Sequence, residues 1–325
     1  MTEFMQAASF IGGTGFYLSL LVVAFWCVSP RPAATVGVAL ALSGTVNAVL
    51  KLVFAQPRPY WNDPQGMAHA AEPTFGMPSG HAQAAVVVWG LLAVHVTRRG
   101  RPVGLPGPLP ALRPGWVWAP AGAVIVLVGV SRVYLGVHSA GQVAAGWAVG
   151  AVLLAGVVRF GPRLLARWRA LRIGWQVTLS AAVTLGAVAG ALAALAPPGE
   201  WGRLLVDGAA VAGPERAGLE DALQAAGLLG GLAAGLSVTA RRGWFTAGGP
   251  PPRRAARLPV GLAGLAVINL TVGFGPAPPA LLCGRLLSGL WIGAGAVEVF
   301  VRAGLARRST PALPRTGEPA MAEDT

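Results

Sequence analysis

Residues 34–54 read ATVGVALALSGTVNAVLKLVF, and Lys51 is the only charged residue among them. A helix needs about 20 predominantly apolar residues to cross the hydrocarbon core of a bilayer, so this stretch predicts a membrane-spanning helix. Eight more apolar runs of similar length lie along the chain. We therefore expect an all-α integral membrane protein with about nine transmembrane helices. Their expected positions are residues 8–28, 34–54, 79–97, 116–133, 138–158, 173–196, 222–240, 258–275 and 280–301.

The composition of the 325-residue chain also indicates a membrane protein. Hydrophobic residues make up 54%, charged residues 11%, and the mean hydropathy is +0.60. A soluble domain usually contains about 25% charged residues. The two cysteines, Cys27 and Cys283, both lie in apolar runs, which excludes a disulfide scaffold or a thiolate metal site.

The net charge of +13 would suggest nucleic-acid binding in a soluble protein, but the positions of the charges indicate a membrane topology. Cytoplasmic loops are enriched in Lys and Arg. With the N-terminus outside and the C-terminus in the cytoplasm, 19 of the 25 Lys and Arg residues lie on the cytoplasmic side, mostly in segments 98–113, 159–172, 241–257 and 302–315. We therefore expect this orientation, in the plasma membrane if the protein is bacterial, with the bilayer rather than nucleic acid as its partner.

Three of the remaining cations and two histidines fall on the outer face in this topology. Lys51 ends the second predicted span, Arg58 follows in the loop, and Arg132 ends the fourth span. His81 opens the third span and His138 opens the fifth. Since the topology was derived from the loop charges alone, their placement at one face is an independent observation.

These residue types suit chemistry on a phosphate ester. Guanidinium groups match the geometry of phosphate oxygens, and a helix N-terminus binds anions. Two histidines supply a nucleophile and a proton donor. No carboxylate cluster or Cys/His spacing indicates a metal, so we expect a phosphoryl-transfer site without a metal or other cofactor.

Three motifs together resemble the signature of the type 2 phosphatidic acid phosphatase superfamily. They are Lys51-x6-Arg58-Pro59, Pro78-Ser79-Gly80-His81 and Ser131-Arg132-x5-His138. The superfamily includes lipid phosphate phosphatases, glucose-6-phosphatase and the vanadium haloperoxidases. The resemblance implies a six-helix membrane phosphatase core over residues 1–196. Three additional transmembrane helices would lie within 197–306, and residues 307–325 would form a disordered cytoplasmic tail.

The resemblance also implies a role for each motif residue. His138 would attack phosphorus and form a phosphohistidine, and His81 would protonate the leaving oxygen. The phosphoryl oxygens would be held by Lys51, Arg58, Ser79, Gly80 and Arg132. The family usually has Asp four residues after the nucleophilic histidine, where this chain has Gln142. The side-chain oxygen of Gln142 can still accept a hydrogen bond from the imidazole one helical turn away, so it would keep the orienting role without the negative charge.

The expected activity is hydrolysis of lipid phosphomonoesters or diphosphates, such as phosphatidic acid or polyprenyl diphosphates, at the extracytoplasmic face. Several features are similar to glucose-6-phosphatases, including nine spans, the Arg58-Pro59-Tyr60-Trp61 sequence, Gln142, and Glu72 nine residues before His81. A sugar phosphatase therefore remains an alternative, as do a phosphotransferase and a catalytically silent membrane scaffold.

Other polar residues receive simpler interpretations. His69, Glu72 and Asp63 lie in the same outer loop, and we expect them to be solvated. Glu298, near the inner end of the ninth span, is expected to pair with a nearby arginine. Gly146 and Gly150 have the spacing of closely packed membrane helices.

Overall fold

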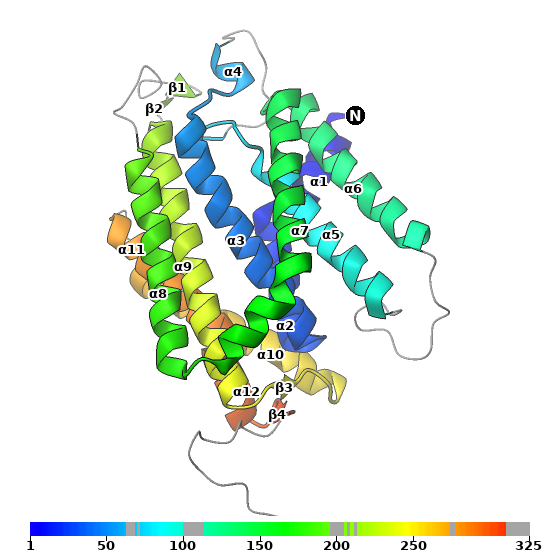
Figure 1. The fold of residues 1–325 in the computed structure, drawn as a ribbon, viewed down its shortest axis with the longest axis vertical. Coiled ribbons are helices and arrows are strands. Elements are labelled where there is room, and N and C mark those ends of the chain that lie inside the picture. Colours follow the sequence, from blue (N-terminus) through cyan, green and yellow to red (C-terminus); the bar gives the residue numbers. More distant parts are fainter. Residues whose placement is uncertain are drawn as a thin grey trace, which may run out of the picture.

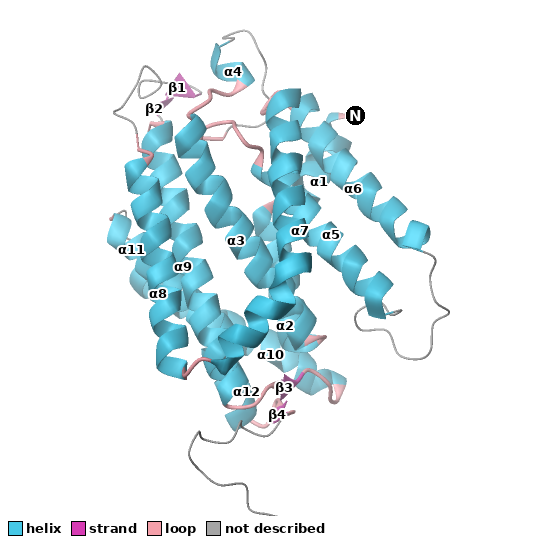
Figure 2. Cartoon of the chain, in the orientation of Figure 1, coloured by secondary structure: helices cyan, strands magenta, loops and turns pink. Residues whose placement is uncertain are grey.

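The computed structural model describes residues 1–62, 69, 72–99, 114–195, 205–206, 209–210, 213–273 and 277–309. Figures 1 and 2 show that long helices make up most of the molecule. The helices are α1 (Thr2–Ile11), α2 (Thr14–Cys27), α3 (Pro30–Phe54), α4 (Pro59–Asn62), α5 (Gly80–Arg99), α6 (Pro114–Tyr134), α7 (Ala140–Ala170), α8 (Ile173–Ala193), α9 (Pro214–Arg241), α10 (Pro251–Ile268), α11 (Pro278–Leu290) and α12 (Ala296–Arg302). Short π-helical segments, Asn269–Gly273 and Trp291–Gly295, continue α10 and join α11 to α12.

The prediction of an all-α membrane protein with about nine spans is confirmed. Within the described residues, eight helices are long and apolar enough to cross a membrane, or nine if α1 and α2 count as one bent span. The bend between α1 and α2 measures 48° and falls at Gly12 and Gly13, inside the run expected to be one straight helix. The side chain of Val128 on α6 occupies the space that a Cβ atom at Gly12 would need, so α6 packs directly against the bend.

Helix α7 differs from its expected position at its C-terminal end. Segment 159–172 was expected to be a cytoplasmic loop, but α7 continues to Ala170 and includes Pro162. Leu, Ala and Arg are strong helix formers, so the helix extends beyond the apolar run that predicted it.

Two glycines bring α7 into close contact with α5. A Cβ atom at Gly146 would lie 2.5 Å from the main-chain oxygen of Ser79, and one at Gly150 would lie 2.8 Å from that of Gln83. The close packing expected at this pair of glycines is therefore present. It joins the start of α5 to the first turns of α7.

The C-terminal helices pack onto the N-terminal ones through α9, which contacts α3, α8 and α11. Gly227, Gly231 and Gly235 recur at every fourth position of α9, where a Cβ atom would lie within 3.1 Å of main-chain oxygens of α11. Bulky side chains at these positions would separate the two helices. The division into a core and an added three-helix segment stays a prediction.

Arg257, in α10, connects the two ends of the chain. It is 1% exposed and donates to the main-chain oxygens of Trp26, Ala247, Gly248 and Leu305 at 2.7–3.0 Å. A buried guanidinium is stable when its N–H groups have acceptors, and these four oxygens supply them.

Two short antiparallel strand pairs lie at opposite ends of the bundle (Figure 2). β1 (Leu205–Val206) pairs with β2 (Ala209–Ala210), and β3 (Phe245–Thr246) pairs with β4 (Arg307–Arg308). The start of the expected disordered tail is therefore part of a strand, while residues 310–325 lie outside the described residues. Glu298 forms ion pairs with Arg242, Arg302 and Arg308 close by, as expected for this glutamate.

The α5–α7 contact generates a stability prediction. Gly150→Val should force the two helices apart and lower the unfolding free energy by about 1–3 kcal/mol, because overpacked contacts relax only partly. The measurement is thermal unfolding of the purified protein in detergent. Gly156→Val, on the same helix with open space around its Cβ position, is the control and should unfold near the wild-type temperature. Equal effects of the two substitutions would contradict the packing described.

Candidate active site

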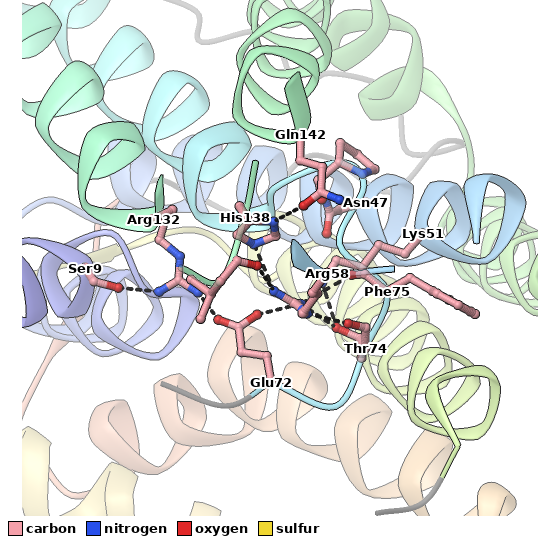
Figure 3. A network of polar contacts seen from close by, with 12 residues as sticks. Ser9, Asn47, Lys51, Arg58, Glu72, Thr74, Phe75, Arg132, His138 and Gln142 are labelled. Atoms are coloured by element: carbon pink, nitrogen blue, oxygen red, sulfur yellow. Dashed lines mark hydrogen bonds and ion pairs between the residues drawn. The ribbon is translucent and has the colours of Figure 1, made fainter. Parts of the chain in front are cut away.

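Four segments of the chain meet at the end of the bundle where α4 lies (Figures 1 and 3). Lys51 is in the last turn of α3, which stops at Ala55 in the left-handed conformation (φ 44°). The chain then turns and places Arg58 just before α4. Arg132 is in the last turn of α6, and His138 lies between α6 and α7. These four functional side chains are all buried.

The guanidinium group of Arg58 lies at the centre of this cluster and is fully buried. Its Nε donates to the main-chain oxygen of Thr74 (2.6 Å), and its Nη1 donates to that of Val137 (3.0 Å). Its Nη2 donates to the Thr74 hydroxyl and to the main-chain oxygen of Phe75, both at 3.3 Å. Arg58 thus connects the loop before α5 with the loop before α7.

The imidazole of His138 is held at both nitrogens. Nη1 of Arg58 lies 3.2 Å from Nε2, and Oε1 of Gln142 lies 3.2 Å from Nδ1. Arginine has no acceptor, so Nε2 accepts from Arg58 and carries no proton, and Nδ1 donates to Gln142. Burial and the Arg58 guanidinium lower the pKa of His138 well below its usual value. The site therefore holds a neutral imidazole with its unprotonated nitrogen facing the cations.

Gln142 is itself fixed by its surroundings. Its Nε2 donates to the main-chain oxygen of Pro57 (2.9 Å), which turns Oε1 toward His138. Its backbone N–H donates to the Ser139 hydroxyl (3.2 Å), and Oε1 also accepts from the backbone N–H of Ser139 (3.3 Å), forming a capping box at the start of α7. Gly76 has no side chain, and a Cβ there would lie 2.6 Å from the Gln142 amide. The contact between Gln142 and His138 is thus built by three separate segments.

Lys51 and Arg58 share one acceptor, the Thr74 hydroxyl. Nζ of Lys51 donates to it at 2.8 Å. The sequence motifs do not mark Thr74, although it lies four residues before Pro78 in the same loop. This hydroxyl keeps the ammonium group next to the guanidinium group despite their like charges.

Glu72 differs from its expected position, because it is not a solvated loop charge. Its carboxylate bridges two cations: Oε2 lies 2.7 Å from Nη2 of Arg58, and Oε1 forms an ion pair with Nη2 of Arg132. The main chain of Glu72 is held by the Tyr60 hydroxyl, which donates to its oxygen and accepts from its N–H, both at 3.0 Å. Burial alone would raise the pKa of Glu72, but Arg58 and Arg132 hold it well below its usual range. The sequence feature that could have indicated this role is the position of Glu72 in a loop that lies between the motif cations Arg58 and Arg132 in the chain.

Arg132 and Ser79 each present a buried polar atom that lacks a hydrogen-bond partner among the described residues. These atoms are Nε of Arg132 and Oγ of Ser79. The other donors of Arg132 reach the Ser9 hydroxyl of α1 and the Glu72 carboxylate. A buried polar group without a partner is costly, so these two atoms are candidates for contact with a bound anion.

The start of α5 is supported by a buried amide network. Nδ2 of Asn47 donates to the main-chain oxygen of Pro78 (3.2 Å) and to Oε1 of Gln83 (2.9 Å). Gln83 in turn donates to the main-chain oxygen and the hydroxyl of Ser43 (2.8 and 2.9 Å). A Cβ atom at Gly80 would lie 3.0 Å from Oδ1 of Asn47, so this motif position has little room for a side chain.

The remaining sequence-predicted residues lie beside the network. The main-chain N–H of Ser79 donates to the main-chain oxygen of Gln142 (3.0 Å). His81 lies in the first turn of α5 and interacts electrostatically with Arg132 and Glu72, without a hydrogen bond to another described residue. His69 is exposed and stacks on Tyr134, with ring centroids 6.4 Å apart.

Asp63 lies outside the described residues. Among the residues that the structure describes, no three His, Cys, Asp or Glu side chains are grouped as a metal site.

Comparisons with known proteins show which family the chain resembles. The model of the PAP2 superfamily matches residues 32–166, which include every motif residue named above, and the model described as PAP2 superfamily phosphatase, transmembrane extension, matches residues 223–308. Phosphatidylglycerophosphatase B of Bacillus subtilis is 30% identical over 159 residues, which cover 47% of this chain and 71% of the relative. The crystal structure of a transmembrane PAP2-type phosphatidylglycerolphosphate phosphatase from Bacillus subtilis is 28% identical, with a TM-score of 0.41, over 50% of this chain and 77% of that chain.

The two contacts of His138 generate a pH prediction. In the wild type, His138 should titrate below pH 6.5, because burial and Arg58 disfavour the imidazolium. Gln142→Glu adds a carboxylate next to Nδ1, which favours the imidazolium and should raise the pKa of His138 by about one to three units. The measurement is an NMR titration of protein labelled in its four histidines, with His138 assigned from its absence in His138→Ala. A wild-type value at or above 6.5, or no change in Gln142→Glu, would contradict the site geometry.

Proposed function

The chain belongs to the PAP2 superfamily and is a phosphoric ester hydrolase of that type, and on this premise we propose that it dephosphorylates membrane lipids through a phosphohistidine intermediate. The observation that carries the proposal is the neutral imidazole of His138, whose unprotonated Nε2 faces Arg58 beside Lys51 and Arg132. A nucleophile next to three cations suits attack on a phosphate ester.

In the proposed reaction, the lone pair of His138 Nε2 leaves its hydrogen bond with Arg58 and attacks phosphorus. An N–P bond forms while the bond from phosphorus to the leaving oxygen breaks. His81 gives its proton to that oxygen, so that the lipid product leaves as an alcohol or, from a diphosphate, as a monophosphate. Water then attacks the phosphohistidine and gives its proton to His81. Orthophosphate departs, and Nε2 regains its lone pair. Gln142 keeps the proton on Nδ1 throughout.

The phosphoryl oxygens would be held by the side chains of Lys51, Arg58 and Arg132, the Ser79 hydroxyl and the main-chain N–H of Gly80. The buried atoms without partners support this assignment, because Oγ of Ser79 and Nε of Arg132 are donors available to an anion. Such fixed donors stabilise the charge that develops on the transferring group.

Two observations support a lipid substrate. The relative from Bacillus subtilis is named phosphatidylglycerophosphatase B, and the candidate site lies at the ends of helices that are long and apolar enough to cross a membrane, where lipid head groups would be close. We therefore propose a lipid phosphomonoester or diphosphate, of the phosphatidic acid or polyprenyl diphosphate class. A soluble sugar phosphate is the second candidate, favoured by the contact of Gln142 with His138, because glucose-6-phosphatases look similar at this position.

The charge distribution supports an extracytoplasmic site. The arginines of segment 241–257 and those of 302–308 lie at the C-terminal end of α9, in α10, in α12 and in β4, at the end of the bundle opposite to α4 (Figure 1). Arginine-rich ends face the cytoplasm. We therefore propose that the N-terminus and the active site face outward and that the C-terminus is cytoplasmic.

The nucleophile assignment predicts the effect of one substitution. His138→Ala should lower phosphate release from phosphatidic acid, polyprenyl diphosphate and glucose 6-phosphate by at least about a thousandfold, because the attacking atom is removed. The assay uses purified protein in detergent. The substrate from which the wild type releases phosphate fastest decides between the lipid and the sugar proposal. His69→Ala, an exposed histidine, is the matched control and should keep most of the activity. Full activity of His138→Ala would exclude His138 as the nucleophile.

The mechanism also predicts indifference to chelators. Three side-chain cations supply the positive charge and an imidazole supplies the nucleophile, so phosphate release should be unchanged after incubation with EDTA. The measurement compares treated and untreated enzyme on the best substrate of the panel. Loss of activity that Mg²⁺ restores would contradict the proposed chemistry.

A further inference from the structure

The Glu72 carboxylate lies between the two guanidinium groups that would bind a phosphoryl group. We propose that Glu72 is an intramolecular competitor of the substrate: its carboxylate binds Arg58 and Arg132 in the empty site and leaves them when a phosphoryl group binds. This inference rests on the proposed function, because it concerns the same phosphoryl site.

The hydrogen bonds of Arg58 show that a phosphoryl group can bind this guanidinium only by displacing one of its present acceptors. A guanidinium group has five N–H donors. The acceptors of Arg58 are the main-chain oxygens of Thr74, Phe75 and Val137, the Thr74 hydroxyl, Nε2 of His138 and the Glu72 carboxylate. All three nitrogens are therefore engaged, and a phosphoryl oxygen can bind Arg58 only if one acceptor gives up its place.

The contact of Nη1 with His138 ends when the Nε2 lone pair attacks phosphorus, and among the acceptors that bind Nη2, Glu72 is the one that can leave with the smallest rearrangement. Three acceptors are main-chain oxygens, and moving them would displace two loops. The Glu72 side chain is 25% exposed, and among the described residues its carboxylate is held only by its two ion pairs, with Arg58 and Arg132. Its main chain stays bound to the Tyr60 hydroxyl through both its N–H and its oxygen, so the displacement is confined to the side chain.

The charges in the site also require the Glu72 carboxylate to be replaced when a phosphoryl group binds. In the empty site, the carboxylate offsets part of the repulsion among Lys51, Arg58 and Arg132. A phosphoryl group brings up to two negative charges at neutral pH. Because like charges repel strongly in a buried site, the carboxylate and the phosphoryl group cannot both lie between the same two arginines. Substrate binding therefore includes breaking two ion pairs of Glu72.

The first test measures binding rather than turnover. Orthophosphate is titrated calorimetrically into the purified full-length protein in detergent, as wild type and as Glu72→Gln. Glutamine has the same shape without the charge, so the variant should bind orthophosphate about tenfold more tightly, the effect of one charge at this range. Glu220→Gln is the matched control, because Glu220 also pairs with an arginine, Arg216, but on α9 outside the site, and its affinity should equal that of the wild type.

Equal or weaker binding by Glu72→Gln would overturn the proposal and make Glu72 a positioning residue for the two arginines. A failure of both proteins to bind orthophosphate would overturn it as well. The experiment separates this inference from the proposed function. Tighter binding without turnover of any substrate removes the hydrolase proposal alone, and turnover without tighter binding removes the competition alone.

A second measurement needs no variant, in case Glu72→Gln does not fold. In a structure of the wild-type protein with vanadate bound, the Glu72 carboxylate should lie beyond ion-pair distance of both guanidinium groups. A carboxylate that still bridges Arg58 and Arg132 beside bound vanadate would overturn the proposal.

Discussion

A guanidinium group removed from water is stable when its N–H groups all find acceptors, and Arg58 is fully buried. Its acceptors come from residues 72–75 and 137–138, so both loops have to be in place before the charge can be accommodated. The same bonds set the position of His138, and through it the contact with Gln142. The α5–α7 contact at Gly146 and Gly150 then fixes the distance between the segments that carry the motifs. The site is in this sense assembled around one buried charge.

Much of this could be predicted from the sequence. Hydropathy found the spans because insertion of a helix depends on its apolar length. The topology derived from the loop charges placed Lys51, Arg58, Arg132 and His138 at one face. The continuation of α7 to Ala170 was missed because hydropathy reports membrane insertion, while Leu, Ala and Arg favour a helix inside or outside a bilayer. The burial of Glu72 was missed because a carboxylate in a loop has no periodicity, and its partners lie 14 and 60 residues away in the chain.

The C-terminal helices show a similar limit. Their sequence has no clustered polar groups, yet Arg257 forms a buried centre of hydrogen bonds, because its four acceptors are main-chain oxygens that no sequence motif records. The glycines of α9 were visible in the sequence, but with 46 glycines in the chain their spacing carries little information alone. Their role is shown by the structure, in which they lie against main-chain oxygens of α11 and leave no room for a side chain. The N-terminal helices and those from α9 onward thus share a packed interior through α9.

The bonds of Arg257 also constrain the order in which the protein can be assembled. Its partners include Trp26 and Leu305, and synthesis reaches Trp26 long before Leu305. The α2–α3 hairpin is therefore made long before its partners at this end of the bundle exist. A chain released before residue 305 would leave a buried cation with unsatisfied donors at the end of the bundle where β3 and β4 pair.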